Sequence, residues 1–476
     1  MVLVIAGDRS GSGKTTVTLA LLAALSRRAA TVQSFKVGPD YIDPMFHQAV
    51  TGRPCRNLDS VLTSEAYVGE CFWRHAPTAE YALVEGVMGL FDGASGKEDV
   101  ASTAHIARLL DLPVLLVLDA SRLSRSIAAI AHGYRSFAPR VKIAGVVLNR
   151  VGSDRHLELL KEALNSIEMP ILGVLRRQDN ITIPDRHLGL IPTDELDGLP
   201  SIFDRLAHLG NTGFNWETLL PLLKTPVGAK PLGDGLSVHA VDYLPTASPL
   251  QTPNPEPQTP NPNLRIAIAR DRAFSFYYAD NLDLLQQLGV QLVPWSPMAD
   301  CQLPEQISGL YFGGGFPEVF AAELSANLPA RKAVKMAVES GMPTYAECGG
   351  LMYLARALID FEGQSRSMVG ILPTTAVMGG KLTLGYRQAL ALRDSPLLPA
   401  GSRVWGHEFH RSHLQNLPPN PLFQLHGFSP AFIPISEGWK LHQLHASYLH
   451  LHWGATRDFP QRFRQHCDRY SRGTDS

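Results

Sequence analysis

The segment "VLVIAGDRSGSGKTT" (residues 2–16) restricts the fold of the N-terminal half more than any other stretch. An apolar run ends at Ala6, a glycine-rich turn follows, and Lys14 opens a run with helical spacing of apolar residues. Backbone amides of such a turn can hold phosphate oxygens, while the lysine reaches the outer phosphates and the next threonine binds Mg²⁺. Five residues separate Gly7 from Gly13, one more than in the common spacing, yet the order strand, turn, helix predicts a nucleotide site. Its expected contacts are Gly11, Gly13, Lys14, Thr15 and Thr16.

The first 225 residues contain further apolar, β-rich runs separated by helical patterns. These runs are 31–37, 81–86, 113–119, 142–149 and 169–175. Their apolarity is continuous rather than alternating, which is typical of strands buried on both faces of a parallel sheet. We therefore expect an α/β fold with a P-loop parallel-sheet domain at 1–225.

A change of composition separates this half from the rest of the chain. Residues 226–263 are rich in proline and contain "QTPNP" twice, which predicts an exposed linker. A second α/β pattern follows, with apolar runs at 264–269, 290–295, 309–315 and 342–348. The sequence therefore predicts two α/β domains, 1–225 and 264–476, joined by the linker.

Charge and cysteine content limit the partners. Lysine and arginine number 43 against 44 acidic residues, so the net charge does not draw the chain to nucleic acid or to an anionic membrane. No apolar run approaches the roughly 18 residues of a membrane span. The five cysteines are odd in number and widely spaced, which is untypical of a disulfide framework. We expect a cytoplasmic protein that acts on small molecules, with no nucleic acid and no membrane as partner.

Acidic residues follow several of the predicted strands. Because the carboxyl ends of parallel strands meet at one edge of a sheet, carboxylates there can hold Mg²⁺ near a bound nucleotide. The candidates are Asp40 and Asp43 in "GPDYIDP", Glu85 and Asp92 in "VEGVMGLFDG", and Asp119. Thr15, Asp40 and Glu85 are the predicted metal ligands.

A single cysteine, Cys348 in "TYAECGG", lies between a strand-like run and a helix-like run. A thiol at such a corner is presented at a tight turn, and the helix end together with a nearby imidazole lowers its pKa. The glycine-rich "FGGGFPE" supplies backbone amides for an oxyanion hole. Cys348 is the predicted nucleophile, and Gly314, Gly315 and Gly349 are the predicted oxyanion donors. Both features resemble class I glutamine amidotransferases.

Several motifs taken together resemble one family, the cobyrinic acid a,c-diamide synthases. They are "KVGPDYIDP", "VEGVMGLFDG", "GVVLNRVGSDRH", "YFGGGFPE", "AECGG", "GHEFHRS" and "HASYLHLHW". The resemblance implies a dethiobiotin synthetase-like ATP domain fused to a class I glutamine amidotransferase domain. It further implies that the enzyme amidates the a and c carboxylates of cobyrinic acid in cobalamin biosynthesis. Its substrates would be a corrinoid polycarboxylate, L-glutamine and ATP, with Mg²⁺ as cofactor.

The resemblance also assigns individual residues. Asn149 would read the adenine edge, and the activated carboxylate would be lined by Asp40, Tyr41, Asp43 and Asp92. Of the histidines at 442, 445, 450 and 452, the family motif places the catalytic base at His450. Ordinary class I amidotransferases have a carboxylate two positions later, where this chain has His452. A Cys348–His450 dyad is therefore expected.

Four alternatives remain open from the sequence. Cobyric acid synthase has a similar architecture, although "GPDYIDP" favours the a,c-diamide family. A nickel-sirohydrochlorin or a hydrogenobyrinic acid diamide synthase would share these motifs and differ in the macrocycle. A P-loop regulatory ATPase would use a similar loop as a switch. The oligomeric state is also open, with a homodimer as one alternative.

Overall fold

The computed structural model describes residues 1–96, 98–177, 185–186, 189–225, 264–429 and 431–473. The chain divides into two compact units, Met1–Leu236 and Ser237–Ser476. The proposed linker, 226–263, lies outside the described residues. Each unit is considered by itself.

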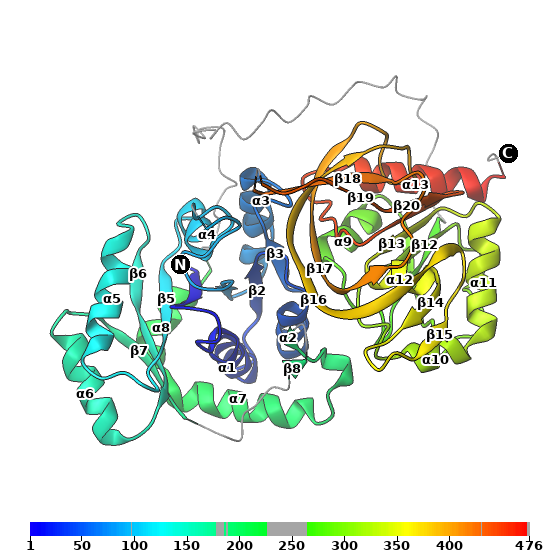
Figure 1. The fold of residues 1–476 in the computed structure, drawn as a ribbon. Helices are drawn as coiled ribbons and strands as arrows, with labels where there is room; N and C mark the ends of the chain where they lie inside the picture. Colours follow the sequence, from blue (N-terminus) through cyan, green and yellow to red (C-terminus); the bar gives the residue numbers. More distant parts are fainter. Residues whose placement is uncertain (97, 178–184, 187–188, 226–263, 430, 474–476) are drawn as a thin grey trace. The chain divides into compact units, whose positions relative to one another are not determined.

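The N-terminal unit is a seven-stranded, all-parallel sheet covered by helices (Figure 1). The strand order is β3-β2-β4-β1-β5-β6-β7. The strands are β1 (Leu3–Gly7), β2 (Val32–Val37), β3 (Arg56–Leu58), β4 (Tyr81–Glu85), β5 (Val114–Asp119), β6 (Ile143–Val151) and β7 (Ile171–Arg176), with a separate pair β8 (Asp185–Arg186) and β9 (Gly189–Leu190). All six apolar runs of the first 225 residues form strands, so the predicted parallel α/β sheet is confirmed.

Helices connect these strands. They are α1 (Lys14–Arg27), α2 (Ile42–Thr51), α3 (Glu65–His75), α4 (Thr103–Leu109), α5 (Ser126–Phe137), α6 (Asp154–Asn165), α7 (Leu199–Gly213) and α8 (Trp216–Leu223), with 3₁₀ turns at Ala76–Thr78 and Thr193–Glu195. α1 packs against α2 and α7, and α5 packs against α6. Side-chain hydroxyls of Ser64, Ser102 and Ser153 cap α3, α4 and α6 by accepting from backbone amides in the first turn.

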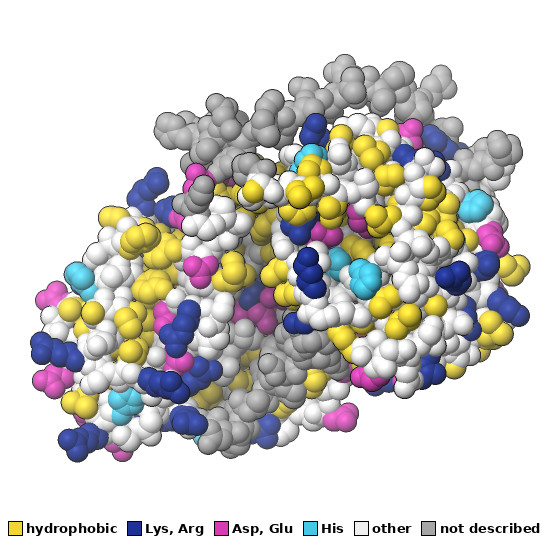
Figure 2. All heavy atoms as spheres, in the orientation of Figure 1, with side chains coloured by type: hydrophobic (Ala, Val, Ile, Leu, Met, Phe, Trp, Pro, Cys, Tyr) yellow, Lys and Arg dark blue, Asp and Glu magenta, His cyan; other side chains and the backbone are white. Residues whose placement is uncertain are grey.

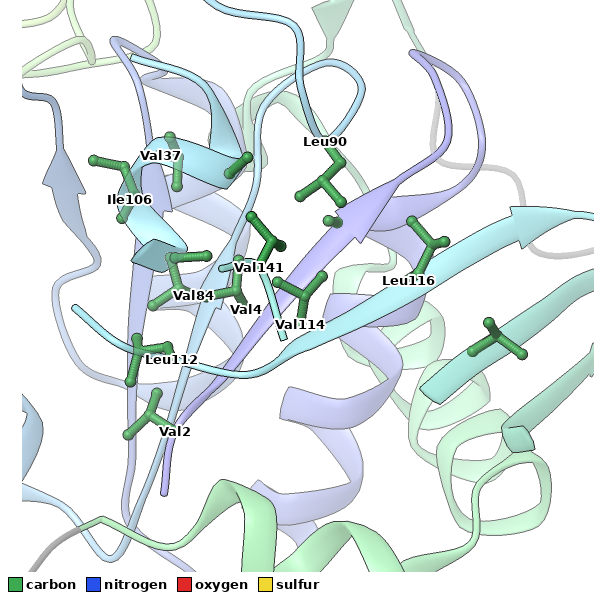
Figure 3. Packing of buried hydrophobic residues seen from close by; sticks show 14 of the residues in the cluster. Val2, Val4, Val37, Val84, Leu90, Ile106, Leu112, Val114, Leu116 and Val141 are labelled. Atoms are coloured by element: carbon green, nitrogen blue, oxygen red, sulfur yellow. The ribbon is translucent and has the colours of Figure 1, made fainter. Parts of the chain in front are cut away.

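Both faces of the sheet are buried. Val4 and Ala6 of β1 belong to one hydrophobic cluster together with residues of the neighbouring strands and of α3 to α6 (Figure 3). Leu3 and Ile5 point to the opposite face and are equally inaccessible to solvent. This two-sided burial explains why the strand sequences are continuously apolar.

The described residues of the C-terminal unit form two six-stranded sheets. The first, in the order β11-β10-β12-β13-β21-β20, is parallel except for β20. Its strands are β10 (Arg265–Ala269), β11 (Gln291–Trp295), β12 (Gly309–Phe312), β13 (Thr344–Glu347), β20 (Trp439–Leu441) and β21 (Leu444–Ser447). The helices of the unit are α9 (Ala279–Gln287), α10 (Ala321–Ala326), α11 (Leu328–Glu339), α12 (Gly349–Leu354) and α13 (Asp458–Ser471). The four apolar runs predicted for this half form β10, β11, β12 and β13.

The second sheet of this unit was not predicted. Its order is β15-β14-β16-β18-β19, and β17 pairs with β16. The strands are β14 (Ala355–Ile359), β15 (Ser365–Ser367), β16 (Leu372–Ala391), β17 (Arg403–Leu414), β18 (Phe423–Gly427) and β19 (Ile435–Glu437). The middle of β16, residues 379–388, is half-buried or exposed, so its sequence lacks the continuous apolarity that marked the other strands.

The surface carries charges of both signs. On the face shown in Figure 2, basic and acidic side chains are interspersed. Within the described part of the chain, no helix has both the length and the apolarity needed to cross a bilayer.

Candidate active sites

The glycine-rich turn between β1 and α1 has the backbone geometry that the phosphate-loop prediction requires. Gly11 and Gly13 have φ values of 76° and 95°, a region that favours glycine. α1 begins directly after the turn, so its first amide groups lie beside the loop. A Cβ on Gly13 would lie 2.1 Å from Nδ2 of Asn149, so glycine is also required there by close packing.

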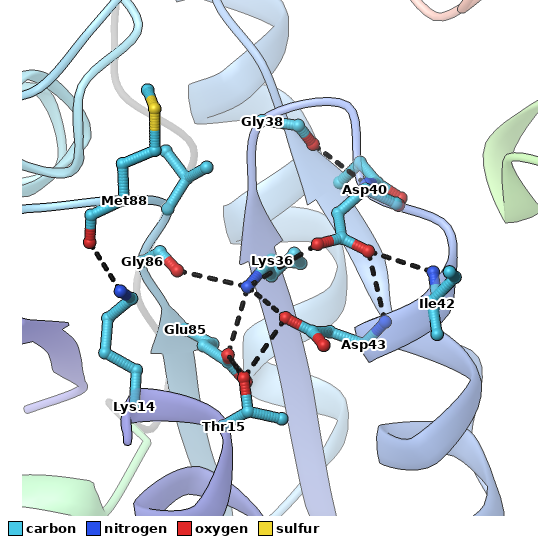
Figure 4. Close-up of polar contacts among 12 residues, drawn as sticks. Lys14, Thr15, Lys36, Gly38, Asp40, Ile42, Asp43, Glu85, Gly86 and Met88 are labelled. Atoms are coloured by element: carbon cyan, nitrogen blue, oxygen red, sulfur yellow. Dashed lines mark hydrogen bonds and ion pairs between the residues drawn. The ribbon is translucent and has the colours of Figure 1, made fainter. Parts of the chain in front are cut away.

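Lys14 is largely buried and is held by the loop that follows β4. Its Nζ donates to the carbonyl oxygen of Met88 at 2.5 Å (Figure 4). Met88 has a φ of 46°, an uncommon conformation for a residue other than glycine. Burial lowers the pKa of Lys14, and the positive charge of the nearby Lys36 lowers it further. An anion bound at the loop would therefore find a desolvated ammonium group beside it.

Thr15, one of the predicted metal ligands, lies within a cluster of charged residues. Its Oγ1 donates to Oε1 of Glu85 at 2.7 Å and lies 3.3 Å from Oδ2 of Asp43. Lys36 Nζ lies between the carboxylates, 2.5 Å from Asp43 Oδ2 and 3.0 Å from Glu85 Oε1 (Figure 4). Burial alone would lower the pKa of Lys36, but the carboxylates of Asp43 and Glu85 outweigh burial and hold that pKa well above its usual value.

Lys36 and His47 were missed by the sequence reasoning. His47 is fully buried on α2, and its Nε2 lies 2.7 Å from Oε2 of Glu85. Its Nδ1 lies 3.3 Å from Sγ of Cys55. Burial opposes ionisation of Glu85, but Lys36 and His47 outweigh burial and hold the pKa of Glu85 below its usual value. The available signal was Lys36 itself, a lysine inside the apolar run 31–37, because lysine is rarely buried without a partner.

The remaining acidic candidates lie at the same edge of the sheet but serve the backbone. Asp40 Oδ1 accepts from the amides of Ile42 and Asp43 at 2.9 and 3.1 Å, so it holds the start of α2, and its Oδ2 lies 3.8 Å from Lys36 Nζ. Asp92 Oδ2 accepts from the Gly89 amide at 3.0 Å and closes a turn. Tyr41, which precedes α2, is buried.

Asn149 and Thr16 border the loop. Asn149 Nδ2 donates to the carbonyl of Ser12 at 2.9 Å, and its Oδ1 accepts from the amide of Arg150 at 3.0 Å. Both polar groups of its side chain are thus bound within the protein. In this structure Asn149 holds the glycine-rich loop through Ser12 and does not offer a hydrogen-bonding group to adenine. Thr16 is the third residue of α1 and is partly buried.

Asp119, at the end of β5, is paired with two arginines. Arg150 Nη1 and Arg9 Nη2 lie 2.7 and 3.2 Å from its Oδ2, and Arg150 also donates to the carbonyl of Gly11 at 3.1 Å. A pocket of about 370 Å³ beside the loop is lined by Arg9, Asp119, Ser121, Arg122, Leu123 and Ile130. This pairing leaves Asp119 committed to the arginines instead of to a metal ion.

Cys348 lies at the predicted corner between β13 and α12. Its φ and ψ are 44° and −97°, which is a strained conformation for a residue other than glycine. Its amide donates to the carbonyl of Ser447 at 2.8 Å, which ties the corner to the end of β21. A Cβ on Gly350 would lie 2.5 Å from Cβ of Phe312, so α12 packs closely against β12. The predicted strand-to-helix turn around this thiol is confirmed.

The expected low pKa of this thiol is wrong for the structure as it stands. Burial raises the pKa of Cys348, and the nearby carboxylates of Glu318 and Glu347 raise it further. A helix of six residues does not offset these carboxylates. The thiol is therefore protonated at rest and must lose its proton to a base during reaction.

Alkylation tests this protonation state. At neutral pH we expect iodoacetamide to modify Cys348 far more slowly than the exposed Cys301, and we expect the rate at Cys348 to rise with pH because more thiolate forms. Mass spectrometry of the two peptides over a pH series measures both rates in one sample. Equal rates at the two cysteines near pH 7 would contradict the raised pKa.

The glycine loop after β12 approaches Cys348 closely. A Cβ on Gly349 would lie 3.0 Å from the amide nitrogen of Gly315, and the amide of Gly350 donates to the carbonyl of Gly313 at 3.1 Å. The amide of Gly314 already donates to the carbonyl of Phe276 at 3.3 Å. The prediction that Gly314 donates to an oxyanion is therefore corrected, and the candidate donors are Gly315 and Gly349.

The structure distinguishes the histidines near the C-terminus. β21 ends at Ser447, so His450 and His452 lie beyond this strand. His450 exchanges backbone hydrogen bonds with His407 and packs on the glycine loop, since a Cβ on Gly314 would lie 2.6 Å from its Cε1. His452 Nε2 lies 3.4 Å from Asp280 Oδ2. His445 Nδ1 lies 3.0 Å from Ser395 Oγ, and burial lowers the pKa of His445 to about 3.

The histidines of "GHEFHRS" have other contacts. His410 stacks on Tyr448 with a centroid distance of 4.0 Å, and its Nδ1 lies 2.8 Å from the carbonyl of Ser412. Glu408, between His407 and His410, lies 2.7 Å from Nε of Arg387. The pKa of His407 is lowered to about 3. Burial is the main cause, and the nearby His450 is the second. A protonated His407 is therefore not available near neutral pH.

Comparisons with known proteins agree with this arrangement. Residues 3–191 match the CobQ/CobB/MinD/ParA nucleotide binding domain, and residues 265–458 match the CobB/CobQ-like glutamine amidotransferase domain. A cobyrinate a,c-diamide synthase from Synechococcus sp. is 60% identical over 98% of both chains, and one from Synechocystis sp. is 52% identical over 98% of this chain and 93% of its own. A hydrogenobyrinate a,c-diamide synthase from Streptomyces coelicolor is 44% identical over 98% of this chain and 97% of its own. The chain belongs to the family of a,c-diamide synthases that build cobalamin by ATP- and glutamine-dependent amidation.

Proposed function

We propose that this chain amidates the a and c carboxylates of cobyrinic acid, using ATP to activate each carboxylate and glutamine to supply ammonia. The observation that carries the proposal is the presence in one chain of a phosphate loop with Lys14 and a strained corner with Cys348. Relatives that are 60% and 52% identical to this chain are cobyrinate a,c-diamide synthases. We assign ATP and the corrinoid to residues 1–225 and glutamine hydrolysis to residues 264–476.

Glutamine hydrolysis would begin at Cys348. Its thiol proton passes to His450 as the sulfur bonds to the side-chain amide carbon of glutamine, giving a tetrahedral oxyanion held by the amides of Gly315 and Gly349. The carbon–nitrogen bond then breaks as His450 returns the proton to the leaving nitrogen, which departs as ammonia. Water attacks the remaining thioester, releasing glutamate and restoring the thiol.

Carboxylate activation would take place at the phosphate loop. A carboxylate oxygen of the corrinoid attacks the γ-phosphorus of ATP, and ADP leaves, so that an acyl phosphate forms. Lys14 and the loop amides stabilise the charge that develops on the phosphate oxygens. Ammonia then attacks the acyl carbon and phosphate departs, which leaves the amide. Asp40, Tyr41, Asp43 and Asp92 are proposed to surround the reacting carboxylate.

The residues near Thr15 fit a Mg²⁺ ion, because they supply the hard oxygen donors that this ion prefers. We propose that Thr15, Asp43 and Asp40 would hold it. Glu85, predicted as a ligand, has both oxygens bound by Thr15, Lys36 and His47, and we propose that it orients Thr15 and Lys36 instead. The ion would offset negative charge on the phosphates when bound.

Asp43→Asn is expected to raise the Mg²⁺ concentration for half-maximal turnover by roughly 10-fold or more, because it removes a charge from this oxygen set. Amidation rates over a Mg²⁺ titration measure the effect, with Asp40→Asn as a second variant. Asp111→Asn, which changes an exposed carboxylate paired with Lys142, is the matched control and should leave the titration unchanged. Unchanged titrations in Asp43→Asn and Asp40→Asn would remove both residues from the proposed metal shell.

The identity of the macrocycle is tested directly. Purified protein is incubated with ATP, Mg²⁺ and glutamine together with cobyrinic acid, hydrogenobyrinic acid or nickel-sirohydrochlorin, and product masses are recorded. We expect a diamide from cobyrinic acid. A diamide from hydrogenobyrinic acid alone would favour the second candidate, which the 44% identical relative supports. ATP hydrolysis without any amide product or glutaminase activity would indicate a regulatory ATPase.

The net charge and the relatives also bear on the location and partners of this enzyme. We propose a cytoplasmic enzyme with small-molecule substrates and no nucleic acid partner, supported by a net charge close to zero and by the relatives being biosynthetic enzymes. A homodimer is proposed as the oligomeric state to be tested by light scattering.

A further inference from the structure

Glu347, the residue immediately before the nucleophile, has its carboxylate fixed in a buried position. It ends β13, and 1% of its surface is exposed. Its Oε1 accepts from the amide of Leu451 at 3.0 Å and from the hydroxyl of Tyr345. Its other oxygen, Oε2, lies 3.7 Å from Nδ1 of His450. We propose that Glu347 is the positioning residue that orients His450, so that the glutaminase site is a triad rather than a dyad.

The backbone explains why these two side chains meet. β13 and β21 are parallel neighbours, and Glu347 is in register with Ser447. The carboxylate at the end of β13 therefore faces the segment that continues from β21 toward His450. Two backbone hydrogen bonds with His407, of 2.9 and 3.0 Å, fix His450 on its other side.

The ring of His450 lies between Glu347 and the glycine loop. Nδ1 is the ring nitrogen nearest the carboxylate. The opposite edge of the ring faces the glycine loop, because a Cβ placed on Gly314 would lie 2.6 Å from Cε1 and 3.4 Å from Nε2. If Nδ1 carries the hydrogen and donates it to Glu347, Nε2 is left as the base for the thiol. The 3.7 Å separation is longer than a hydrogen bond, as is common for catalytic pairs before substrate binds.

Three other buried acids of this unit, Glu408, Glu437 and Asp280, have partners other than His450. Glu408 pairs with Arg387 at 2.7 Å, and Glu437 accepts from Ser447 Oγ at 2.6 Å and from the amide of Tyr448 at 2.8 Å. Asp280 faces His452. Glu347 lies within 4.0 Å of His450 and forms an ion pair with it when His450 is protonated.

A carboxylate at Nδ1 does two things for the base. It selects the tautomer whose Nε2 can take the thiol proton, and it stabilises the imidazolium that forms when the proton arrives. Glu347 also raises the pKa of Cys348, so its negative charge does not help to form the thiolate directly. Its contribution is made through His450. The proposal rests on the proposed glutamine hydrolysis.

Glu347→Gln tests the proposal. Glutamine has the same size and can still accept from Leu451 and Tyr345, but its amide would donate a hydrogen toward Nδ1 and favour the tautomer with Nε2 protonated. We expect kcat for glutamine hydrolysis to fall by about 10²- to 10⁴-fold, with KM for glutamine changed by less than about threefold. Amidation driven by ammonium chloride should be retained. Glu347→Asp, which keeps the charge, should recover part of the loss.

Glu437→Gln is the matched control. Burial raises the pKa of Glu437 to about 8, so this acid is protonated near pH 7 and glutamine resembles it closely. We expect glutamine and ammonium activities close to those of the unchanged protein.

Two results would overturn the proposal. The first is an unchanged kcat in Glu347→Gln. The second is that both Glu347→Gln and Glu347→Asp lose the glutamine and ammonium activities in parallel and have a lowered melting temperature. The second result would mean that Glu347 only supports folding. If the proposed glutamine hydrolysis itself were wrong, the result would be distinct, because the protein without any substitution would then hydrolyse no glutamine.

Discussion

Cys348→Ala is expected to abolish glutamine-dependent amidation while leaving amidation by ammonium salts at alkaline pH largely intact. In the proposed mechanism the thiol forms the bond to glutamine, so its removal stops the release of ammonia from glutamine. Free ammonia, which is plentiful above pH 9, bypasses that step and attacks the acyl phosphate directly. The measurement is product formation with each nitrogen source, and we expect the glutamine rate to fall by at least about 10³-fold.

Cys467→Ala is the control for this variant. Cys467 is also fully buried in the C-terminal unit, where it packs close to Gly309. Its replacement should cost on the order of 1 kcal/mol of folding stability and leave the ratio of the two activities unchanged. If Cys348→Ala reduced both nitrogen sources in the same proportion, Cys348 would be a packing residue and the amidotransferase mechanism would fail.

Lys14→Ala is expected to abolish amidation with both nitrogen sources, because each requires the acyl phosphate. The variant removes the ammonium group closest to the phosphate loop, and we expect a loss of about 10³-fold or more in turnover. Glutamine hydrolysis at Cys348, measured alone as glutamate release, should continue. This pattern is the reverse of that for Cys348→Ala, so the two variants separate the two sites.

The control is Lys142→Ala, which removes an exposed lysine paired with Asp111. It should change neither activity, since an exposed ion pair contributes little. Near-normal amidation by Lys14→Ala with ammonium chloride would contradict the assignment of the ATP site.

Much of the fold was predictable because its signals are local. Continuous apolar runs such as 113–119 indicate strands that are buried on both faces of a parallel sheet. The glycines at 11 and 13 indicate a turn that requires positive φ. The corner at Cys348 was predictable for the same reason. By contrast, β16 is partly buried in its central part, so its sequence carried no such signal.

The sites were predictable only in part. Motif spacing predicted roles for Lys14, Thr15 and Cys348, and the family resemblance predicted roles for His450 and Asn149; these roles stay predictions. The structure binds the side chain of Asn149 to the loop, and it binds both oxygens of Glu85, predicted as a metal ligand, to protein groups. Neighbouring strands brought Lys36 and Glu85 together across 49 residues, a pairing that no spacing rule contains.

The amino-acid sequence by itself determined the chemistry that this chain can perform, because a phosphate loop and a nucleophile corner are short segments whose geometry depends on their own residues. Tertiary structure decided the environment of each reacting group. The thiol pKa of Cys348 depends on burial and on carboxylates such as Glu318, which only folding brings near. The carboxylate facing His450 is likewise decided by the pairing of β13 with β21, since it comes from Glu347, 103 positions earlier in the chain, and not from position 452. Electrostatic and hydrogen-bonding interactions act over a few ångströms in space, whatever the separation along the chain.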